Sequence, residues 1–240
     1  METFADKDLS GARFDRCDLS RIVMRGVILD GADLDDPWLL SEGSTLLVNG
    51  IDVVPFVRAE LAKQFPGHEG RLATDLAGAR EGYETVQAAW EPALERAAAL
   101  PDGAVDVQVD GEWSFSQTLR HLVMATDVWL RGAILGVEQP YHPLGVPYEE
   151  FAADGHDTSV FTPGIPPYDD VLEARANRVA MVRDFLATAT DADLQAPRRH
   201  PWAPDREVST LHCLRTILDE EWSHLRFALR DLARVEAPAP

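Results

Sequence analysis

The chain has very little cysteine: Cys17 and Cys213 are the only two among its 240 residues. They lie in unrelated segments, which excludes a disulfide framework and makes a reducing, cytoplasmic setting the default expectation. No apolar run approaches the roughly 20 residues that cross a bilayer, so we expect no membrane-spanning segment. The first ten residues, METFADKDLS, have neither a basic stretch nor an apolar core, so they do not have the form of a signal peptide.

Basic side chains are also scarce. Lys and Arg number 22 against 41 Asp and Glu, which gives a formal net charge of −19. A negative field of this size repels phosphate backbones, so we expect no nucleic-acid partner. A glycine-rich phosphate loop, a nucleophile elbow and a paired-cysteine zinc motif are absent as well, which excludes the sites that these motifs build. Hydrophobic residues make up 45% of the chain, enough for a globular core.

A repeat of five residues runs through the first forty positions. Large apolar side chains recur at this interval, and small or apolar residues stand two positions before most of them. A period of five fits neither a helix nor a strand. It favours a coil in which each five-residue side turns a corner and points one large side chain inward. The large residues are Phe4, Leu9, Phe14, Leu19, Met24, Leu29 and Leu34.

The segments FDRCDLSRIV and LDGADLDD resemble pentapeptide-repeat proteins. The resemblance implies a right-handed, four-sided β-helix over residues 1–40. Seven repeats give fewer than two coils, and repeat solenoids are stabilised by stacked neighbours, so we expect this segment to pack on the rest of the chain. Some pentapeptide-repeat proteins mimic DNA through an acidic surface. Residues 1–40 carry nine acidic and five basic side chains, so most of the charge lies elsewhere and DNA mimicry is the weaker alternative.

Residues 41–72 are predicted to form a β-hairpin and a linker. Two apolar runs flank Asn49 and Gly50, the dipeptide favoured in a type I′ turn. The segment FPGHEG then interrupts the chain before the first long helix.

The apolar spacing between residues 73 and 235 predicts helices. The first is expected to be kinked at Pro92, and the second begins with a capping box at Ser114 and ends at Gly136. Two proline-rich loops separate the later helices. The predicted fold class is therefore mainly α, a four-helix bundle preceded by a short repeat coil and a β-hairpin, with a tail at 236–240. The predicted helices span residues 73–100, 115–136, 168–189 and 210–235.

The last predicted helix brings charged side chains next to its apolar stripe. At about 100° per residue, Glu221 falls inside the stripe, His224 lies about 60° away, and Glu220 lies about 40° beyond His224. His224 is therefore within one turn of both carboxylates. His212 falls on the opposite face, where we expect solvent. The stripe consists of Leu214, Leu218, Leu225, Ala228 and Leu232.

The second predicted helix also turns a histidine inward. His121 shares a face with small and apolar residues, and together with His224 and an inward carboxylate it forms a set that suits a divalent metal. Three protein ligands leave a coordination position open, as in catalytic rather than structural sites. The alternative is a buried polar contact between histidine and glutamate without a metal. The shared face consists of Thr118, His121, Ala125, Val128, Gly132 and Leu135.

The segments GEWSFSQTLRHLVMATDVWLRGAILG, YHPLG and CLRTILDEEWSHLRFALRDL resemble the DinB-like superfamily over residues 73–235. Its members are four-helix bundles that include thiol-dependent S-transferases and mycothiol-dependent maleylpyruvate isomerase. The resemblance implies a metal held by three histidines, one on the second helix and two that stand four residues apart on the last. His121 matches the first and His224 the last, whereas Glu220 stands at the middle position. A site of two histidines and one carboxylate is chemically sound.

The resemblance also implies an activity. We expect a metal-dependent enzyme that uses a low-molecular-weight thiol. The enzyme either transfers this thiol to a small electrophilic substrate or uses it to isomerise that substrate. His121, Glu220 and His224 are the predicted ligands of zinc, with nickel, iron or manganese as alternatives. Glu221 is the predicted catalytic residue, as general base or as a side chain that tunes the metal, and it competes with Glu220 as third ligand. A homodimer is expected from the family, and the alternative function is a non-catalytic scaffold protein with a degenerate metal site.

Overall fold

A computed structural model describes residues 3–14, 17–36, 39–40 and 43–236. The chain divides into two compact units, Met1–Asp36 and Pro37–Pro240. No helix in the described part of the chain is long and apolar enough to cross a membrane.

The first unit consists of turns joined by extended segments, and none of its described residues is assigned to a helix or strand. Backbone hydrogen bonds of 2.9–3.1 Å close equivalent turns at ten-residue intervals. In two of these turns an aspartate caps the bend: the Oδ1 atom of Asp8 accepts from the amide of Ser10, and Asp18 does the same for Ser20. The bonds that close the turns run from Ala12 to Leu9, Ile22 to Leu19 and Ala32 to Leu29. The four-sided β-helix stays a prediction.

The large side chains of the five-residue repeat are more exposed than we expected. Their exposed fractions run from 39% at Leu19 to 66% at Leu34, and Cys17 is exposed too. Fewer than two coils of the predicted β-helix would leave most of these side chains without a neighbour stacked on both sides, which agrees with the exposure of the described ones.

The second unit opens with the expected hairpin. β1 (Leu47–Val48) pairs antiparallel with β2 (Ile51–Asp52). Asn49 has a φ of 50° and Gly50 a φ of 81°, the left-handed values that a type I′ turn requires at both central positions. The helix α1 (Val54–Gln64) and the short 3₁₀ helix η1 (His68–Leu72) follow, where the sequence predicted only a linker.

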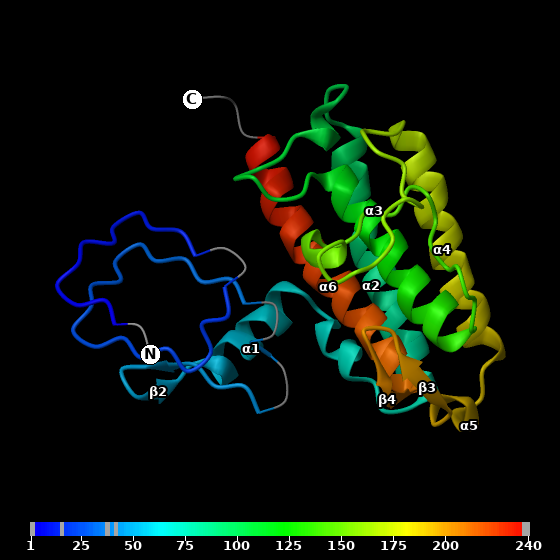
Figure 1. The fold of residues 1–240 in the computed structure, drawn as a ribbon, viewed down its shortest axis with the longest axis horizontal. Helices are drawn as coiled ribbons and strands as arrows, with labels where there is room; N and C mark the ends of the chain where they lie inside the picture. The colour runs from blue at the N-terminus through cyan, green and yellow to red at the C-terminus, as the bar shows by residue number, and fades with distance from the viewer. Residues whose placement is uncertain (1–2, 15–16, 37–38, 41–42, 237–240) are drawn as a thin grey trace. The chain divides into compact units, whose positions relative to one another are not determined.

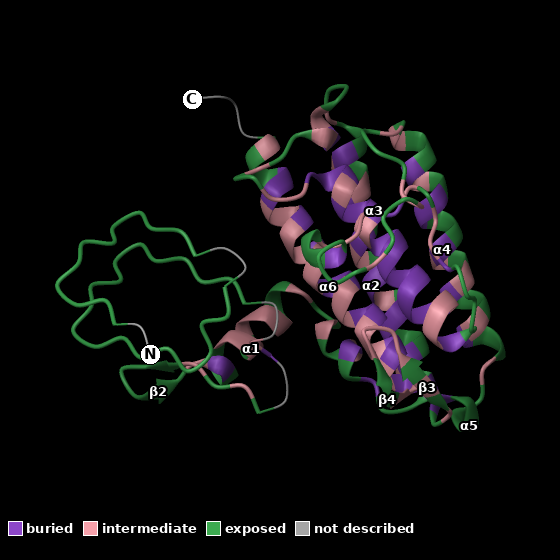
Figure 2. Ribbon diagram, in the orientation of Figure 1, coloured by how far each residue is buried: buried purple, intermediate pink, exposed green. Residues whose placement is uncertain are grey.

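Four long helices pack together in the rest of the unit (Figure 1). They are α2 (Leu76–Ala98), α3 (Phe115–Thr126) with its continuation η3 (Asp127–Ile134), α4 (Tyr168–Thr188) and α6 (Thr210–Val235). α2 packs on α6 and α4, and α3 packs on the same two helices. Figure 2 shows the buried residues on the faces that these helices turn toward one another. The prediction of a mainly α fold is confirmed.

Short elements connect the long helices. They are the 3₁₀ helices η2 (Ala104–Asp106) and η4 (Glu149–Phe151), the helix α5 (Asp191–Leu194), and the antiparallel strands β3 (Pro197–His200) and β4 (Ala203–Ser209). The sequence did not predict the β3–β4 hairpin, because its prolines masked the alternation of a strand. Pro197 begins its strand, a place where a missing amide does little harm.

The start of α3 follows from local sequence. The hydroxyl of Ser114 accepts from the amide of Gln117, and the side chain of Gln117 accepts from the amide of Ser114, so the predicted capping box is present. α2, by contrast, runs through Pro92 as one assigned helix.

The second half of the predicted second helix is a π-helix. η3 begins at the buried Asp127, and a π turn holds more residues than an α turn, so the side chains beyond it are rotated from their expected positions. Leu135, which we expected on the inner face with His121, is 50% exposed for this reason. Gly136 ends the helix with a φ of 69°, as predicted.

The interior of the second unit is built from aliphatic and aromatic side chains of all four long helices. Trp90 on α2 and Trp222 on α6 are each 2% exposed, and each such burial contributes ~1.5–3 kcal/mol of hydrophobic free energy. Charged groups are buried among them, and two of these, Asp127 and Glu221, lie on the helices that carry the candidate site.

Candidate metal centre

The fold brings the three predicted metal ligands together. His121 projects from α3, and Glu220 and His224 project from α6, the helix that packs on it. Each side chain offers one ligand atom, and these atoms lie within 4.8 Å of one another. Among the described residues this is the one cluster of histidine, cysteine and carboxylate side chains with such spacing.

The carboxylate of Glu220 lies next to both rings. Its Oε2 atom is 3.5 Å from Nε2 of His121 and 3.3 Å from Nδ1 of His224. The two imidazoles stack with a centroid separation of 4.7 Å and an angle of 30°. The side chains of both histidines are 12% exposed and that of Glu220 is 24% exposed, so the cluster is largely shielded but still reached by solvent.

Main-chain carbonyls determine which nitrogen of each ring carries a proton. Nδ1 of His121 lies 3.0 Å from the carbonyl oxygen of Val146, and Nδ1 of His224 lies 2.9 Å from that of Glu220. A carbonyl oxygen only accepts hydrogen bonds, so both Nδ1 atoms must donate. Each ring is therefore left with its lone pair on Nε2, the nitrogen available to a metal.

This tautomer leaves an unfavourable contact between His121 and Glu220. The Nε2 lone pair of His121 faces the Oε2 atom of Glu220 at 3.5 Å, so two acceptors point at each other. Buried acceptors in contact are unfavourable unless a cation lies between them. Either a proton or a metal ion meets that requirement, and imidazole nitrogen with carboxylate oxygen is a donor set suited to zinc, nickel, iron and manganese.

The ionisation states of His224 and Glu220 favour binding of a cation. Burial lowers the pKa of His224 to about 4, helped by the nearby His121 and opposed by Glu220, so its ring is neutral near pH 7 and able to donate its lone pair. Burial acts to raise the pKa of Glu220, but its contacts with His121 and His224 outweigh this effect and lower that pKa. Glu220 is therefore an ionised, acceptor-only group.

Trp113 forms one wall of the cluster. Its ring centroid lies 4.4 Å from that of His121 and 6.0 Å from that of His224, with the latter pair stacked at 20°. Phe227, one turn along α6, meets His224 edge to face at 5.8 Å. Helical spacing did not predict the position of Trp113 beside both imidazoles, because Trp113 precedes α3.

Glu221 points to a different set of partners. Its carboxylate is 1% exposed and paired with the buried guanidinium of Arg175 from α4. Burial raises the pKa of Glu221, and Arg175 opposes that shift. Within the described residues, no hydrogen bond or ion pair joins Glu221 to His121 or His224, because neighbouring helical residues diverge by ~100°. Its role as general base stays a prediction, and this pairing opposes it, since a base must reach the proton that it removes.

The surroundings of Glu221 are polar although they are buried. Arg175 also donates to the side chain of Gln87 at 3.4 Å. Several buried polar atoms there have no hydrogen-bond partner within the described residues. These atoms are Tyr83 Oη, Gln87 Nε2, Trp90 Nε1, Arg175 Nη1 and Glu221 Oε1.

Two further histidines, His142 and His212, lie outside the candidate cluster. Nδ1 of His142 accepts from the amide of Leu144 at 3.2 Å, so its Nε2 carries the proton in the neutral ring and is not free to bind a metal. His212, expected in solvent, is half-buried and meets Trp129 edge to face at 5.9 Å. Cys213 is fully buried.

These features define a helical protein with a candidate cation site of two imidazoles and one carboxylate between two packed helices. The sequence profile of the DinB superfamily matches residues 85–228. The chain therefore belongs to the DinB superfamily. Pentapeptide repeats match residues 8–36. No characterised protein and no solved structure matches the chain significantly.

Proposed function

We propose that the four packed helices form a DinB-like four-helix bundle that holds a divalent metal ion on His121, Glu220 and His224. The contact between Nε2 of His121 and Oε2 of Glu220 supports this proposal most strongly, because both atoms are acceptors and face each other at 3.5 Å. A cation between them converts an unfavourable contact into two ligand bonds. The same set without a metal would need a shared proton.

Zinc is the ion that we propose first, with nickel, iron and manganese as alternatives. Two imidazole nitrogens and one carboxylate oxygen suit all four, and three protein ligands leave room for a further ligand. Such an ion acts as a Lewis acid that stabilises an anionic nucleophile. Glu220 replaces the middle histidine of the DinB-like pattern, so the ligand set carries one negative charge more than a set of three neutral imidazoles.

The nucleophile that we propose is a low-molecular-weight thiol supplied from outside the chain. Burial raises the pKa of Cys213 to about 11 and its side chain is fully buried, so it is an inert core thiol near neutral pH. Cys17, the other thiol, belongs to the first unit. The proposed activity is transfer of such a thiol to a small electrophile, or thiol-assisted isomerisation of one. The homodimer and the cytoplasmic setting stay predictions.

The activity is tested by incubating the zinc-loaded protein with mycothiol, bacillithiol or glutathione and a small electrophile such as monochlorobimane or maleylpyruvate. The proposal expects turnover that requires both zinc and one of the thiols and that is lost in His224→Ala. Glu81→Gln, which changes an exposed carboxylate on α2, serves as the control and should keep full activity. Zinc binding without any zinc-dependent turnover across these pairs would contradict the enzymatic proposal and favour a scaffold role.

A further inference from the structure

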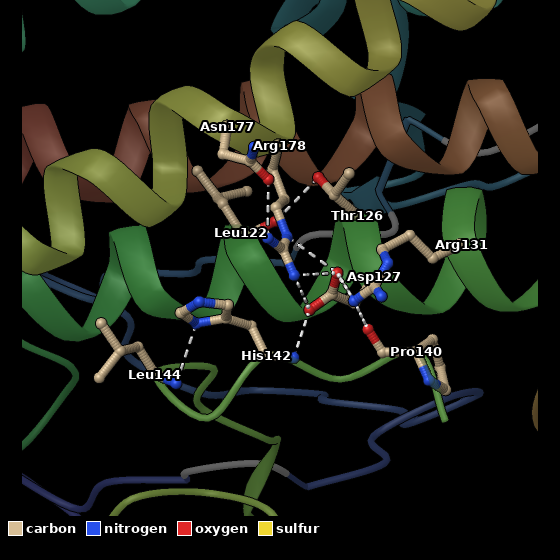
Figure 3. Close-up of polar contacts among 9 residues, drawn as sticks. All are labelled: Leu122, Thr126, Asp127, Arg131, Pro140, His142, Leu144, Asn177 and Arg178. Atoms are coloured by element: carbon tan, nitrogen blue, oxygen red, sulfur yellow. Dashed lines mark hydrogen bonds and ion pairs between the residues drawn. The ribbon is translucent and has the colours of Figure 1, made fainter. Parts of the chain in front are cut away.

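The loop that follows η3 runs back along α3 and is fastened to it at every second residue. We call residues 140–146 the strap. At its start, Arg131 donates to the carbonyl of Pro140. Two residues later the amide of His142 donates to Oδ2 of Asp127 at 2.7 Å. Figure 3 shows these two anchors side by side on the π-helical segment.

The far end of the strap is fastened next to the metal site. Nε of Arg120 donates to the carbonyl of Leu144 at 2.8 Å, and the amide of Val146 donates to the carbonyl of Arg120 at 3.2 Å. The carbonyl of Val146 then accepts from Nδ1 of His121 at 3.0 Å. The strap therefore ends on the carbonyl of Val146, which determines the tautomer and the ring orientation of the proposed ligand His121.

Asp127 is the centre of the anchor at the start of the strap. Its side chain is fully buried, and it accepts from Nε of Arg178 at 2.9 Å and from Nη2 at 3.2 Å. Arg131 adds a fourth contact to the carboxylate at 3.3 Å, after those from Arg178 and the amide of His142. The guanidinium of Arg178 comes from α4, so this pair joins two helices and the strap at one point (Figure 3).

The turn between the two ends of the strap is closely packed. The amide of Gly145 donates to the carbonyl of His142 at 2.9 Å. A Cβ atom at Gly145 would lie 3.0 Å from the ring of Phe161 and 3.3 Å from Cβ of Met124. Displacing His142 at the anchor is therefore expected to move Val146, because the short turn between them is packed on both sides.

We propose that Asp127 and Arg178 are positioning residues for the metal ligand His121. They hold the strap so that the carbonyl of Val146 accepts from Nδ1 of that ring and leaves Nε2 toward Glu220. Asp127 follows His121 by six residues, about 9 Å along a helix, and acts only through the strap. This inference rests on the proposed metal site for its functional meaning, but the tautomer of His121 is a property of the metal-free protein.

The first experiment measures that tautomer in the metal-free full chain by long-range ¹H–¹⁵N correlation spectra at mildly alkaline pH. The wild type should show His121 with its proton on Nδ1 alone. Asp127→Asn and Gly145→Ala should both give a mixture of the two tautomers. Val182→Ala, which opens a small cavity in the buried part of α4, should leave the wild-type tautomer unchanged. If Asp127→Asn does not fold, Gly145→Ala carries the same test.

The second experiment measures Co²⁺ affinity for the same variants, with and without His121→Ala. Asp127→Asn should weaken Co²⁺ binding about tenfold, as is typical for partners that orient a ligand. In the His121→Ala background the same change should have almost no effect on Co²⁺ binding. A general loss of structure would instead weaken Co²⁺ binding in both backgrounds. A folded Asp127→Asn and Gly145→Ala with an unchanged tautomer would overturn the inference. A wild type that shows the expected tautomers but binds no Co²⁺ would overturn the proposed metal site instead.

Discussion

The Nε2 atom of His121 and the Oε2 atom of Glu220 face each other at 3.5 Å, although they come from different helices. The carbonyl of Val146 holds the proton of His121 on Nδ1, so the facing atoms are both acceptors. A cation is the simplest partner for such a pair, and the nearby neutral ring of His224 supplies a third ligand.

Substitutions at Glu220 separate the role of its charge from that of its position. Glu220→Ala should weaken Zn²⁺ binding by more than the ~10–100-fold typical of an outer partner, because a ligand is removed. Glu220→His restores the three-histidine pattern of the DinB-like superfamily and should keep the affinity within about tenfold of the wild type. Isothermal titration with Zn²⁺ measures both. Equal affinity in the wild type and Glu220→Ala would remove Glu220 from the ligand set.

Trp113 should report metal binding by its fluorescence. Its ring lies 4.4 Å from that of His121, so a paramagnetic ion such as Co²⁺ bound to that imidazole would quench it strongly. The chain has six tryptophans, so we expect partial quenching that saturates with binding. Trp113→Phe should abolish most of the saturable quenching and leave the Co²⁺ affinity, measured by absorbance, nearly unchanged. Quenching that persists in full in Trp113→Phe would place the ion elsewhere.

The buried pair of Arg175 and Glu221 should matter for stability more than for metal binding. Arg175→Met leaves the carboxylate of Glu221 buried and unpaired, which costs about 3–5 kcal/mol of unfolding free energy. Replacing both, as Arg175→Met with Glu221→Leu, should recover much of that loss. Urea unfolding followed by circular dichroism measures the difference.

An exposed ion pair provides the control for that experiment. Arg183 on α4 pairs with Glu84 on α2 where both side chains are about half exposed, so Arg183→Met should cost only ~0–1 kcal/mol. A similar cost for Arg175→Met and Arg183→Met would mean that the Glu221 cluster is far better solvated than its burial indicates.

His68 should make stability depend on pH. Its ring packs edge to face on Trp222, and burial, together with the charges of Arg71, Arg226 and Arg58, lowers its pKa to about 4. The unfolded chain takes up this proton near pH 6.5 but the folded chain does not. The contribution of His68 is therefore fully present above pH 6.5 and is lost as pH falls toward 4.

The substitution His68→Phe isolates this effect. It keeps an aromatic ring against Trp222 and removes the titrating group, so the variant should lose about 1 kcal/mol less stability than the wild type between pH 7 and pH 4, after discounting for partial solvation. Urea unfolding at a series of pH values gives the two curves. Parallel curves would contradict the lowered pKa of His68.

Helical spacing predicted that His121, His224 and one inward carboxylate would meet, and the resemblance to the DinB-like superfamily singled out Glu220. His121 lies on the inner face of one helix, and Glu220 and His224 are one turn apart on another, so a mainly α fold with packed helices was enough to bring them together. Spacing did not decide between Glu220 and Glu221, because both lie within reach of His224. The structure separates them by their partners, since Glu221 is paired with Arg175.

Features that depend on loops or on a changed helical repeat were not predictable. The carbonyl of Val146 reaches His121 from a loop with no regular spacing, and nothing in the sequence marks it. The π-helix begins at Asp127, where a buried pair joins it to Arg178 from a distant segment, and helical spacing indicates neither feature. Leu135 was misplaced for that reason, and the β3–β4 hairpin was missed because its prolines oppose a strand assignment.

The most direct test of the metal site is the metal content of untagged protein. Elemental analysis of the wild type, purified without chelators and also after reconstitution with zinc, nickel, iron or manganese, should give about one ion per chain. His224→Ala should give almost none, while Glu81→Gln should match the wild type. Absence of a bound metal in the wild type after reconstitution, or an equal content in His224→Ala, would contradict the assignment of His121, Glu220 and His224 as a metal site.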